Sequence, residues 1–258
     1  MGVVIICSFL PLILSNFLPA NHGAAVFADV TSANVVGYQE IGSNASGFTM
    51  LAPTFLGVGN TEGCTLKDLR VTGYEGECKG KFVLQLLTST GGDDGTYYWV
   101  DKSGKTAGWY ASALGSAIPG GPESINIAAG RGMWCKGVGM KLVPAGEVCK
   151  ALTEFDTNES GFTATGNSSP VDITLDKLTV TGYEGECKGK FVLQLLTSTG
   201  GDDGTYYWVD KSGKTAGWYA SALGSAIPGG PESVTITAGR GLWCKGVGMT
   251  LKIPSAIK

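Results

Sequence analysis

A long internal repeat constrains the fold of this 258-residue chain more than any other feature. Residues 71–124 recur without one change as residues 180–233, at an offset of 109. The similarity continues downstream of both segments, and upstream it reaches Ser46 and Ser160 across a five-residue deletion. We therefore expect two tandem domains, residues 29–147 and 148–258, each large enough to bury its own core. The period is too long for a solenoid of short repeats.

Within each copy, short runs rich in β-branched and aromatic residues alternate with turns of Gly, Pro and Asp-Gly, which is typical of β-strands. The chain contains 41 Gly, and glycine-rich loops such as residues 91–95 interrupt both helices and strands. We expect an all-β fold of two near-identical domains, each a β-sandwich or a partly open barrel. Only residues 110–114 have helical character. The strands predicted in the first copy are 35–41, 48–55, 66–72, 82–88, 96–101, 107–111, 124–128, 133–136 and 140–143.

Residues 1–28 have the features of an export signal. The stretch from Val3 to Leu18 is apolar and uncharged, and small residues precede Asp29. The stretch is shorter than the roughly 20 residues that span a bilayer, although a membrane anchor is the alternative. We expect cleavage after Ala28, a mature chain with no membrane span, and a secreted, extracellular or cell-envelope location.

Cleavage after residue 28 also removes His22, the single histidine of the chain. The mature chain would then have no residue for Ser-His-Asp or Cys-His catalysis or for His-ligated zinc. A net charge of −3 gives no basic surface for nucleic acid. We therefore expect no nucleic-acid partner, no cofactor, no metal site and no enzymatic activity.

Six cysteines remain after residue 28, and the repeat narrows their pairing. Two candidate pairs occupy equivalent positions in the copies and span 57 residues each. A disulfide across such a loop would stabilise the fold by about 4 kcal/mol. The other two cysteines have no counterpart, so they either join the domains or stay free and buried. The predicted pairs are Cys78–Cys135, Cys187–Cys244 and, across the domains, Cys64–Cys149.

The segment Tyr97–Tyr110 predicts an aromatic β-hairpin. A two-residue loop at residues 103–104 would pair Trp99 with Gly108, and a large ring over a bare cross-strand glycine fixes strand register. Strand alternation then leaves rings on both faces of the hairpin. One face would be a flat binding platform, or both faces are covered inside a sandwich. The candidate ligand-binding residues are Tyr97, Trp99, Asp101 and Trp109, with their repeats Tyr206, Trp208, Asp210 and Trp218.

Two resemblances follow from these motifs. The spacing of Tyr98 and Trp109 resembles one unit of the choline-binding and glucan-binding cell-wall repeats, with Gly104 one position late. The wider pattern includes Asn34-Val-Val-Gly-Tyr38 and Ala129-Gly-Arg-Gly-Met-Trp134. It resembles uncharacterised secreted β-domain proteins of verrucomicrobial and lentisphaeral bacteria. That resemblance implies export and a surface or matrix setting, without an assigned chemistry.

Three functions remain open at this point. The favoured one is a non-catalytic structural or adhesive protein of the exterior or envelope, whose partner is a polysaccharide or another surface or matrix protein. The first alternative is a carbohydrate-binding module that uses the aromatic hairpins. The second is a glycosidase that uses two carboxylates. The carboxylates available for that chemistry are Glu75, Glu77, Asp93, Asp94 and Asp101.

Overall fold

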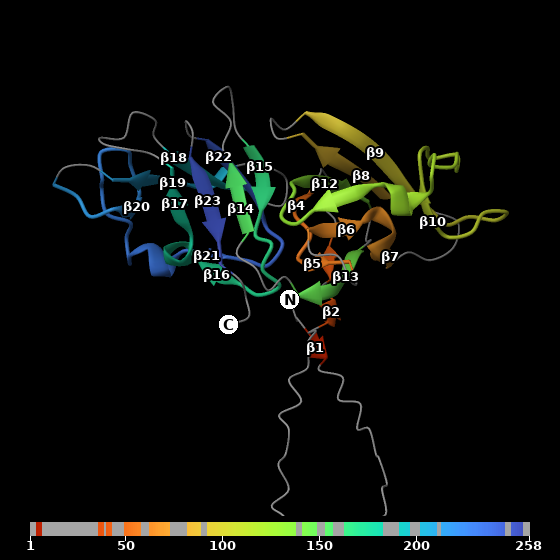
Figure 1. Cartoon of the computed structure of the whole chain (residues 1–258), viewed down its shortest axis with the longest axis horizontal. Helices are drawn as coiled ribbons and strands as arrows, with labels where there is room; N and C mark the ends of the chain where they lie inside the picture. The colour runs from red at the N-terminus through yellow and green to blue at the C-terminus, as the bar shows by residue number, and fades with distance from the viewer. Residues whose placement is uncertain are drawn as a thin grey trace, which may run out of the picture.

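The computed structural model shows an antiparallel, all-β protein (Figure 1). Among the residues that the structure describes, the regular elements are strands and four single-turn 3₁₀ helices. Those short helices are η1 (Leu66–Asp68), η2 (Pro122–Ser124), η3 (Leu175–Lys177) and η4 (Pro231–Ser233). The structure describes residues 4–6, 36–38, 40–42, 49–57, 62–72, 82–88, 92–137, 141–148, 153–156, 163–182, 191–196, 202–210, 213–245 and 249–254.

Each half of the chain contains one five-stranded sheet. In the first half the order is β10-β9-β8-β12-β4, and in the second it is β20-β19-β18-β22-β15. Both sheets have the same register irregularity, between Gln85 and Leu87 and between Gln194 and Leu196. The strands of the first sheet are β4 (Thr49–Leu51), β8 (Phe82–Leu87), β9 (Asp93–Val100), β10 (Gly108–Tyr110) and β12 (Met133–Lys136). Those of the second are β15 (Thr163–Gly166), β18 (Phe191–Leu196), β19 (Asp202–Val209), β20 (Gly217–Tyr219) and β22 (Gly241–Lys245).

A second layer forms around one long strand in each half. In the first half β13 pairs with β2, β3, β5 and β7, and β1 pairs with β2. In the second half β23 lies between β14 and β17, and each half also has a two-stranded ribbon, β6 with β11 and β16 with β21. The first-half strands are β1 (Val4–Ile6), β2 (Val36–Tyr38), β3 (Ile41–Gly42), β5 (Phe55–Leu56), β6 (Gly63–Thr65), β7 (Leu69–Thr72), β11 (Asn126–Ala128) and β13 (Lys141–Val148). The second-half strands are β14 (Thr153–Asp156), β16 (Ile173–Thr174), β17 (Thr179–Thr181), β21 (Thr235–Ile236) and β23 (Thr250–Ile253).

The core of each half lies between these layers. In the first half Leu84 and Met133 of the five-stranded sheet share one buried cluster with Leu142 of β13. In the second half Leu193 and Leu251 share the equivalent cluster. This two-layer packing corresponds to the sandwich alternative, and no sheet in the described part of the chain closes on itself.

The structure differs from the predicted strands at several places. The predicted strands 35–41 and 48–55 are each interrupted, and residues 66–68 and 124 belong to the 3₁₀ helices η1 and η2. Strand β6 was not predicted, and residues 110–114 form no helix. Strand β13 continues through Pro144 to Val148, one residue beyond the predicted domain boundary. Pro144 is the last residue of the ladder with β7, opposite Leu69, and from Ala145 onward β13 pairs with β2 and then β5, so the proline stands where one ladder ends.

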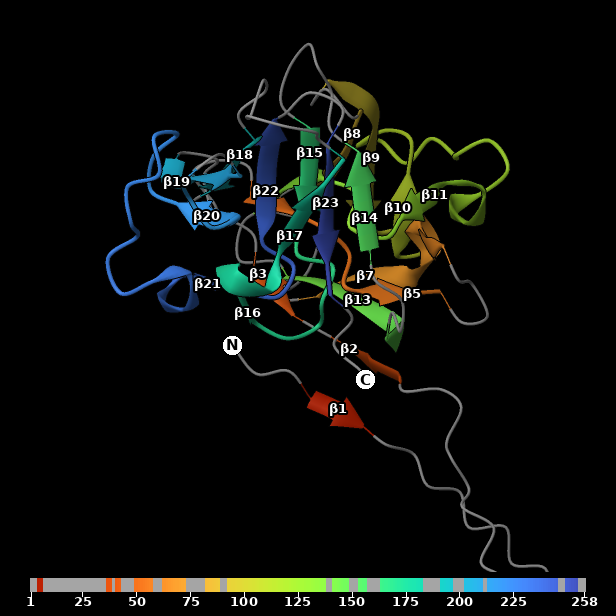
Figure 2. The same ribbon diagram turned by 60° about the vertical axis from the view of Figure 1, so that its left-hand side comes forward.

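Most of the predicted signal peptide, including Ala28, lies outside the described residues. Of residues 1–28 the structure describes only strand β1, which lies along β2 at the edge of the molecule (Figure 2). In the described residues, no helix combines the length and the apolar character needed to cross a bilayer.

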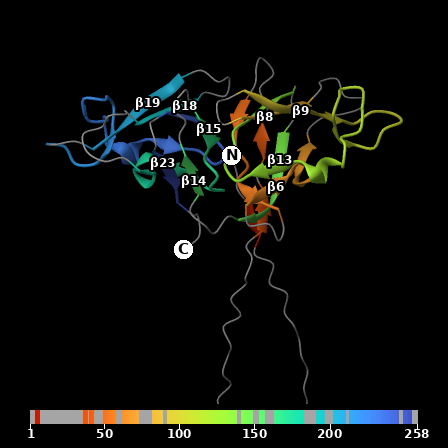
Figure 3. The same ribbon diagram turned by 45° about the horizontal axis from the view of Figure 1, so that its top comes forward.

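The halves lie side by side and meet through equivalent strands (Figure 3). Leu51 of β4 bridges to Arg240 of the other half, and Arg131 bridges to Thr165 of β15. The sequence repeat makes Arg131 equivalent to Arg240 and, across the deletion, Leu51 equivalent to Thr165. The same contact is therefore made twice, as in an isologous dimer interface. We call this contact the joint.

Candidate functional site

The aromatic hairpin is the first candidate site, and its register differs from the prediction. Trp99 lies opposite Trp109 rather than Gly108, and Tyr98 lies opposite Tyr110. The turn closes with the N–H of Lys105 donating to the carbonyl of Lys102 at 3.0 Å. Residues 101–107 nevertheless lie outside the ladder between β9 and β10. The segment between the turn and β10 is therefore one residue longer than a two-residue loop at residues 103–104 predicts. A one-residue excess shifts every cross-strand pair by one position.

The tryptophans of the hairpin are structural. Trp109 is buried, and its indole N–H donates to the carbonyl of Leu69 at 2.6 Å. Trp99 packs edge-on against it, with ring centroids 5.4 Å apart and planes at 82°. In the second half Trp218 is likewise buried and donates to the carbonyl of Leu178 at 2.8 Å. Its ring meets Trp208 at 5.3 Å and 79°.

The remaining predicted binding residues also fail to form a flat platform. Tyr97 and Tyr206 are half-buried and pack against the cores of their halves. Desolvation, with the nearby charge of Asp94, raises the pKa of Tyr97 above its ordinary value. Asp101 is half-buried and Asp210 exposed. The structure thus places the hairpin face with Tyr97 and Trp99, and its repeat with Tyr206 and Trp208, against the core of its half, so that face offers no flat platform for a ligand.

Beyond each hairpin, a loop closed by its own backbone hydrogen bonds carries an exposed leucine. We call residues 111–121 and 220–230 the outer loops. Leu114 and Leu223 are each 79% exposed, whereas most large apolar side chains of the described residues are covered. Lys105 of the hairpin turn anchors the first outer loop. Its ammonium donates to the carbonyl of Gly115 at 3.0 Å and lies 5.8 Å from the centre of the Tyr110 ring. The same contacts recur at Lys214.

Two of the carboxylates considered for glycosidase chemistry, Asp93 and Asp94, are bonded to other groups of the first half. Asp93 accepts a hydrogen bond from the N–H of Gly95 at 2.9 Å, and Asp94 forms an ion pair with Arg131. Glu75 and Glu77 lie outside the described residues. In the described part of the chain, no cluster of His, Cys, Asp or Glu side chains is suited to a metal ion.

The predicted disulfides are not present in this structure. The three described cysteines, Cys64, Cys135 and Cys244, have free, buried thiols. Cys78, Cys187 and Cys149, their predicted partners, lie outside the described residues. Cys135 and Cys244 point from the five-stranded sheets into the two cores, where each acts as a small apolar side chain. The equal 57-residue spacing therefore reflects the repeat itself and is no evidence for pairing.

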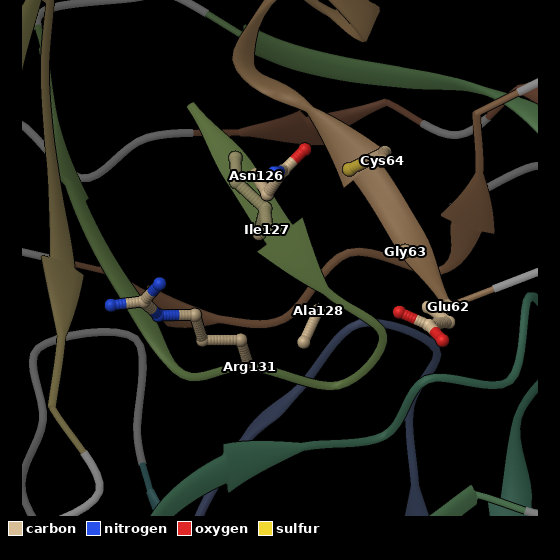
Figure 4. A pocket seen from close by; sticks show the side chains of 7 residues that line it. All are labelled: Glu62, Gly63, Cys64, Asn126, Ile127, Ala128 and Arg131. Atoms are coloured by element: carbon tan, nitrogen blue, oxygen red, sulfur yellow. The ribbon is translucent and has the colours of Figure 1, made fainter. Parts of the chain in front are cut away.

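One pocket, of about 410 Å³, opens beside the ribbon of β6 and β11 (Figure 4). Glu62 and Cys64 lie on one side, and Asn126 and Arg131 on the other. Burial raises the pKa of the Cys64 thiol to about 12, so the thiolate needed for nucleophilic chemistry is absent at neutral pH. The pocket therefore offers no activated nucleophile.

Comparison with protein-family models, curated proteins and solved structures finds no match to this chain.

The buried thiols predict a loss of stability at high pH. Burial raises the pKa of Cys64, Cys135 and Cys244 from 9.0 to about 12. Between these values the unfolded chain releases thiol protons that the folded chain retains, so the free energy of unfolding falls as pH rises. Urea denaturation at pH 7.5 and pH 10.5 measures this decline. The Cys135→Ala/Cys244→Ala variant should decline less steeply, and an equal decline would assign the effect to other groups.

Proposed function

We propose that the chain is an exported, non-catalytic structural or adhesive protein that presents one binding surface twice, on its two outer loops. The observation that carries this proposal is the pair of exposed leucines, Leu114 and Leu223, at equivalent positions of identical loops. Covering such a leucine with a partner surface removes an apolar side chain from water, which contributes about 1.5–3 kcal/mol.

The arrangement of the halves supports a bivalent role. The first outer loop follows β10 and the second follows β20, at opposite ends of the molecule (Figure 1). The joint holds the two halves together, so the loops point away from each other. Two equal sites on one chain raise avidity on a multivalent surface and can bridge two particles.

Agglutination of envelope particles from the producing organism tests this proposal. Leu114→Ser, with one loop intact, should bind particles roughly 100-fold more weakly and should no longer bridge them. Leu114→Ser/Leu223→Ser should lose binding as well. The matched control Ala111→Ser/Ala220→Ser changes exposed positions of the same loops and should agglutinate like the parent. Agglutination by the double leucine variant at the parent's level would disprove the proposal.

A further inference from the structure

A second pocket, of about 520 Å³, lies at the joint. Residues of the first half form one wall, including Leu87 and Asp94 of the five-stranded sheet and Arg131. Strands β14 and β15 of the second half form the other wall. The volume lies within the range of small-molecule sites, about 300–1,000 Å³. The outer loops contribute nothing to its lining.

The polar groups of this joint pocket are held in place. The Nε of Arg131 donates to the carbonyl of Leu87 at 3.1 Å, and its guanidinium pairs with Asp94. On the opposite wall, Glu154 pairs with Lys252 at 2.8 Å. These bonds fix one donor and two acceptor groups before a ligand arrives, which lowers the cost of ordering them on binding.

The apolar part of the lining includes one aromatic ring. Phe155 lies between Glu154 and Asp156, and its ring packs against the backbone of Gly130 in the other half. A Cβ at Gly130 would lie 2.1 Å from the Cζ atom of Phe155, so only glycine allows this approach. The Thr250 hydroxyl donates to Asp156 at 2.7 Å, which fixes a third acceptor in the lining of the pocket.

The charges select the class of ligand. Arg131 and Lys252 neutralise two of the three carboxylates in the lining, and the third is Asp156. An anion would meet the remaining negative charge, and a cation would meet the guanidinium. A neutral polyol uses both donor and acceptor groups, and the apolar face of a sugar ring fits an aromatic wall. We propose that the joint pocket binds one short, neutral saccharide per chain.

The two halves differ at the residues that make this site. Phe155 pairs with Leu251 in β23, and the equivalent pair in the first half is Ile41 with Leu142. By the same register, Asp156 corresponds to Gly42. The aromatic ring of Phe155 and the carboxylate of Asp156 therefore have no equivalent in the first half. We expect one saccharide to bind per chain. This goes beyond the twin outer loops, which would bind two partners.

Calorimetric titration of the full chain with cellobiose, maltose, lactose, chitobiose and mannobiose tests the site. At least one disaccharide should bind with a stoichiometry of one. Asp94→Asn and Phe155→Ile should each weaken that binding about tenfold, since each removes one fixed contact of the pocket. Asp203→Asn breaks the equivalent ion pair with Arg240 in the other half and should leave the affinity unchanged.

The matched pair separates binding from folding. Asp94 and Asp203 are equally exposed, 54% and 55%, so both variants should melt at the same temperature. The proposal fails if none of the five disaccharides binds at millimolar concentration, if Asp203→Asn weakens binding as much as Asp94→Asn, or if two molecules bind per chain. Agglutination measures binding by the outer loops, whereas calorimetric titration measures binding by the joint pocket. Either proposal can therefore fail without the other.

Discussion

Trp109→Ala is expected to unfold the first half of the chain while the second half stays folded, with a loss of about 3–5 kcal/mol in the free energy of unfolding. The side chain is only 5% exposed, and its indole N–H is bonded to the carbonyl of Leu69. Truncation leaves a cavity and an unpaired carbonyl in the core. Because β10 and β7 belong to different sheets, the variant also removes a bond between the two layers.

Urea denaturation followed by brief proteolysis and mass spectrometry measures which half opens. Trp218→Ala is the matched control, since its surroundings repeat those of Trp109 and its bond to Leu178 is equivalent. It should destabilise the second half by a similar amount. Trp109→Phe keeps a ring and loses the hydrogen bond, so it should fall between the parent and the alanine variant. A loss below about 1 kcal/mol in Trp109→Ala would contradict a structural role.

The repeat and the strand pattern could be predicted from the sequence because both depend on local chemistry. The segment Phe82–Leu87 is β-branched, aromatic or aliphatic except at Gln85 and is followed by turn residues, and it forms β8 as expected. Identical segments also adopt identical registers, down to the irregularity after Gln85 and Gln194. Strand β6 was missed because Gly63–Thr65 has a weak pattern of its own and is formed by pairing with β11.

Two properties of the aromatic hairpin could not be predicted from the sequence: which of its faces is buried, and the register of its two strands. Alternation correctly indicated rings on both faces, but it does not show which face another layer covers. The carbonyl that binds Trp109 belongs to Leu69, 40 positions earlier in the chain. Leu69 lies in β7, and β7 lies beside Trp109 only because segments far apart in the sequence pack together. The register error has a similar cause, since one extra residue in a loop is invisible in a pattern of period two.

The joint was not predicted at all. Its cluster consists of Met50, Leu87 and Ala164, with Trp134 and Trp243 packed against it. Small and apolar residues at an interface look the same in a sequence as residues of a single core. The sequence differences between the two copies do indicate where the joint pocket lies. Phe155 and Asp156, which replace Ile41 and Gly42, mark the half that completes the joint pocket.

Gly132→Val is expected to open the joint while both halves stay folded. A Cβ at Gly132 would lie 2.9 Å from the backbone carbonyl carbon of Ala164 in the other half. Backbone cannot rotate away as a side chain can, so the clash has to be relieved by moving one half. Overpacking of this kind costs about 1–3 kcal/mol, and the joint has only a small apolar cluster to oppose it. Small-angle scattering should show a larger radius of gyration.

Gly241→Val repeats the test from the other side, where a Cβ would lie 2.4 Å from Cγ of Met50. Gly108→Val is the control, because a Cβ there meets nothing within 4 Å. Unchanged scattering in both joint variants would show that the backbone yields locally. An opened joint has two functional consequences. The outer loops would lose their fixed separation and bridge particles less efficiently, and the walls of the joint pocket would part, abolishing saccharide binding in a chain whose two cores remain intact.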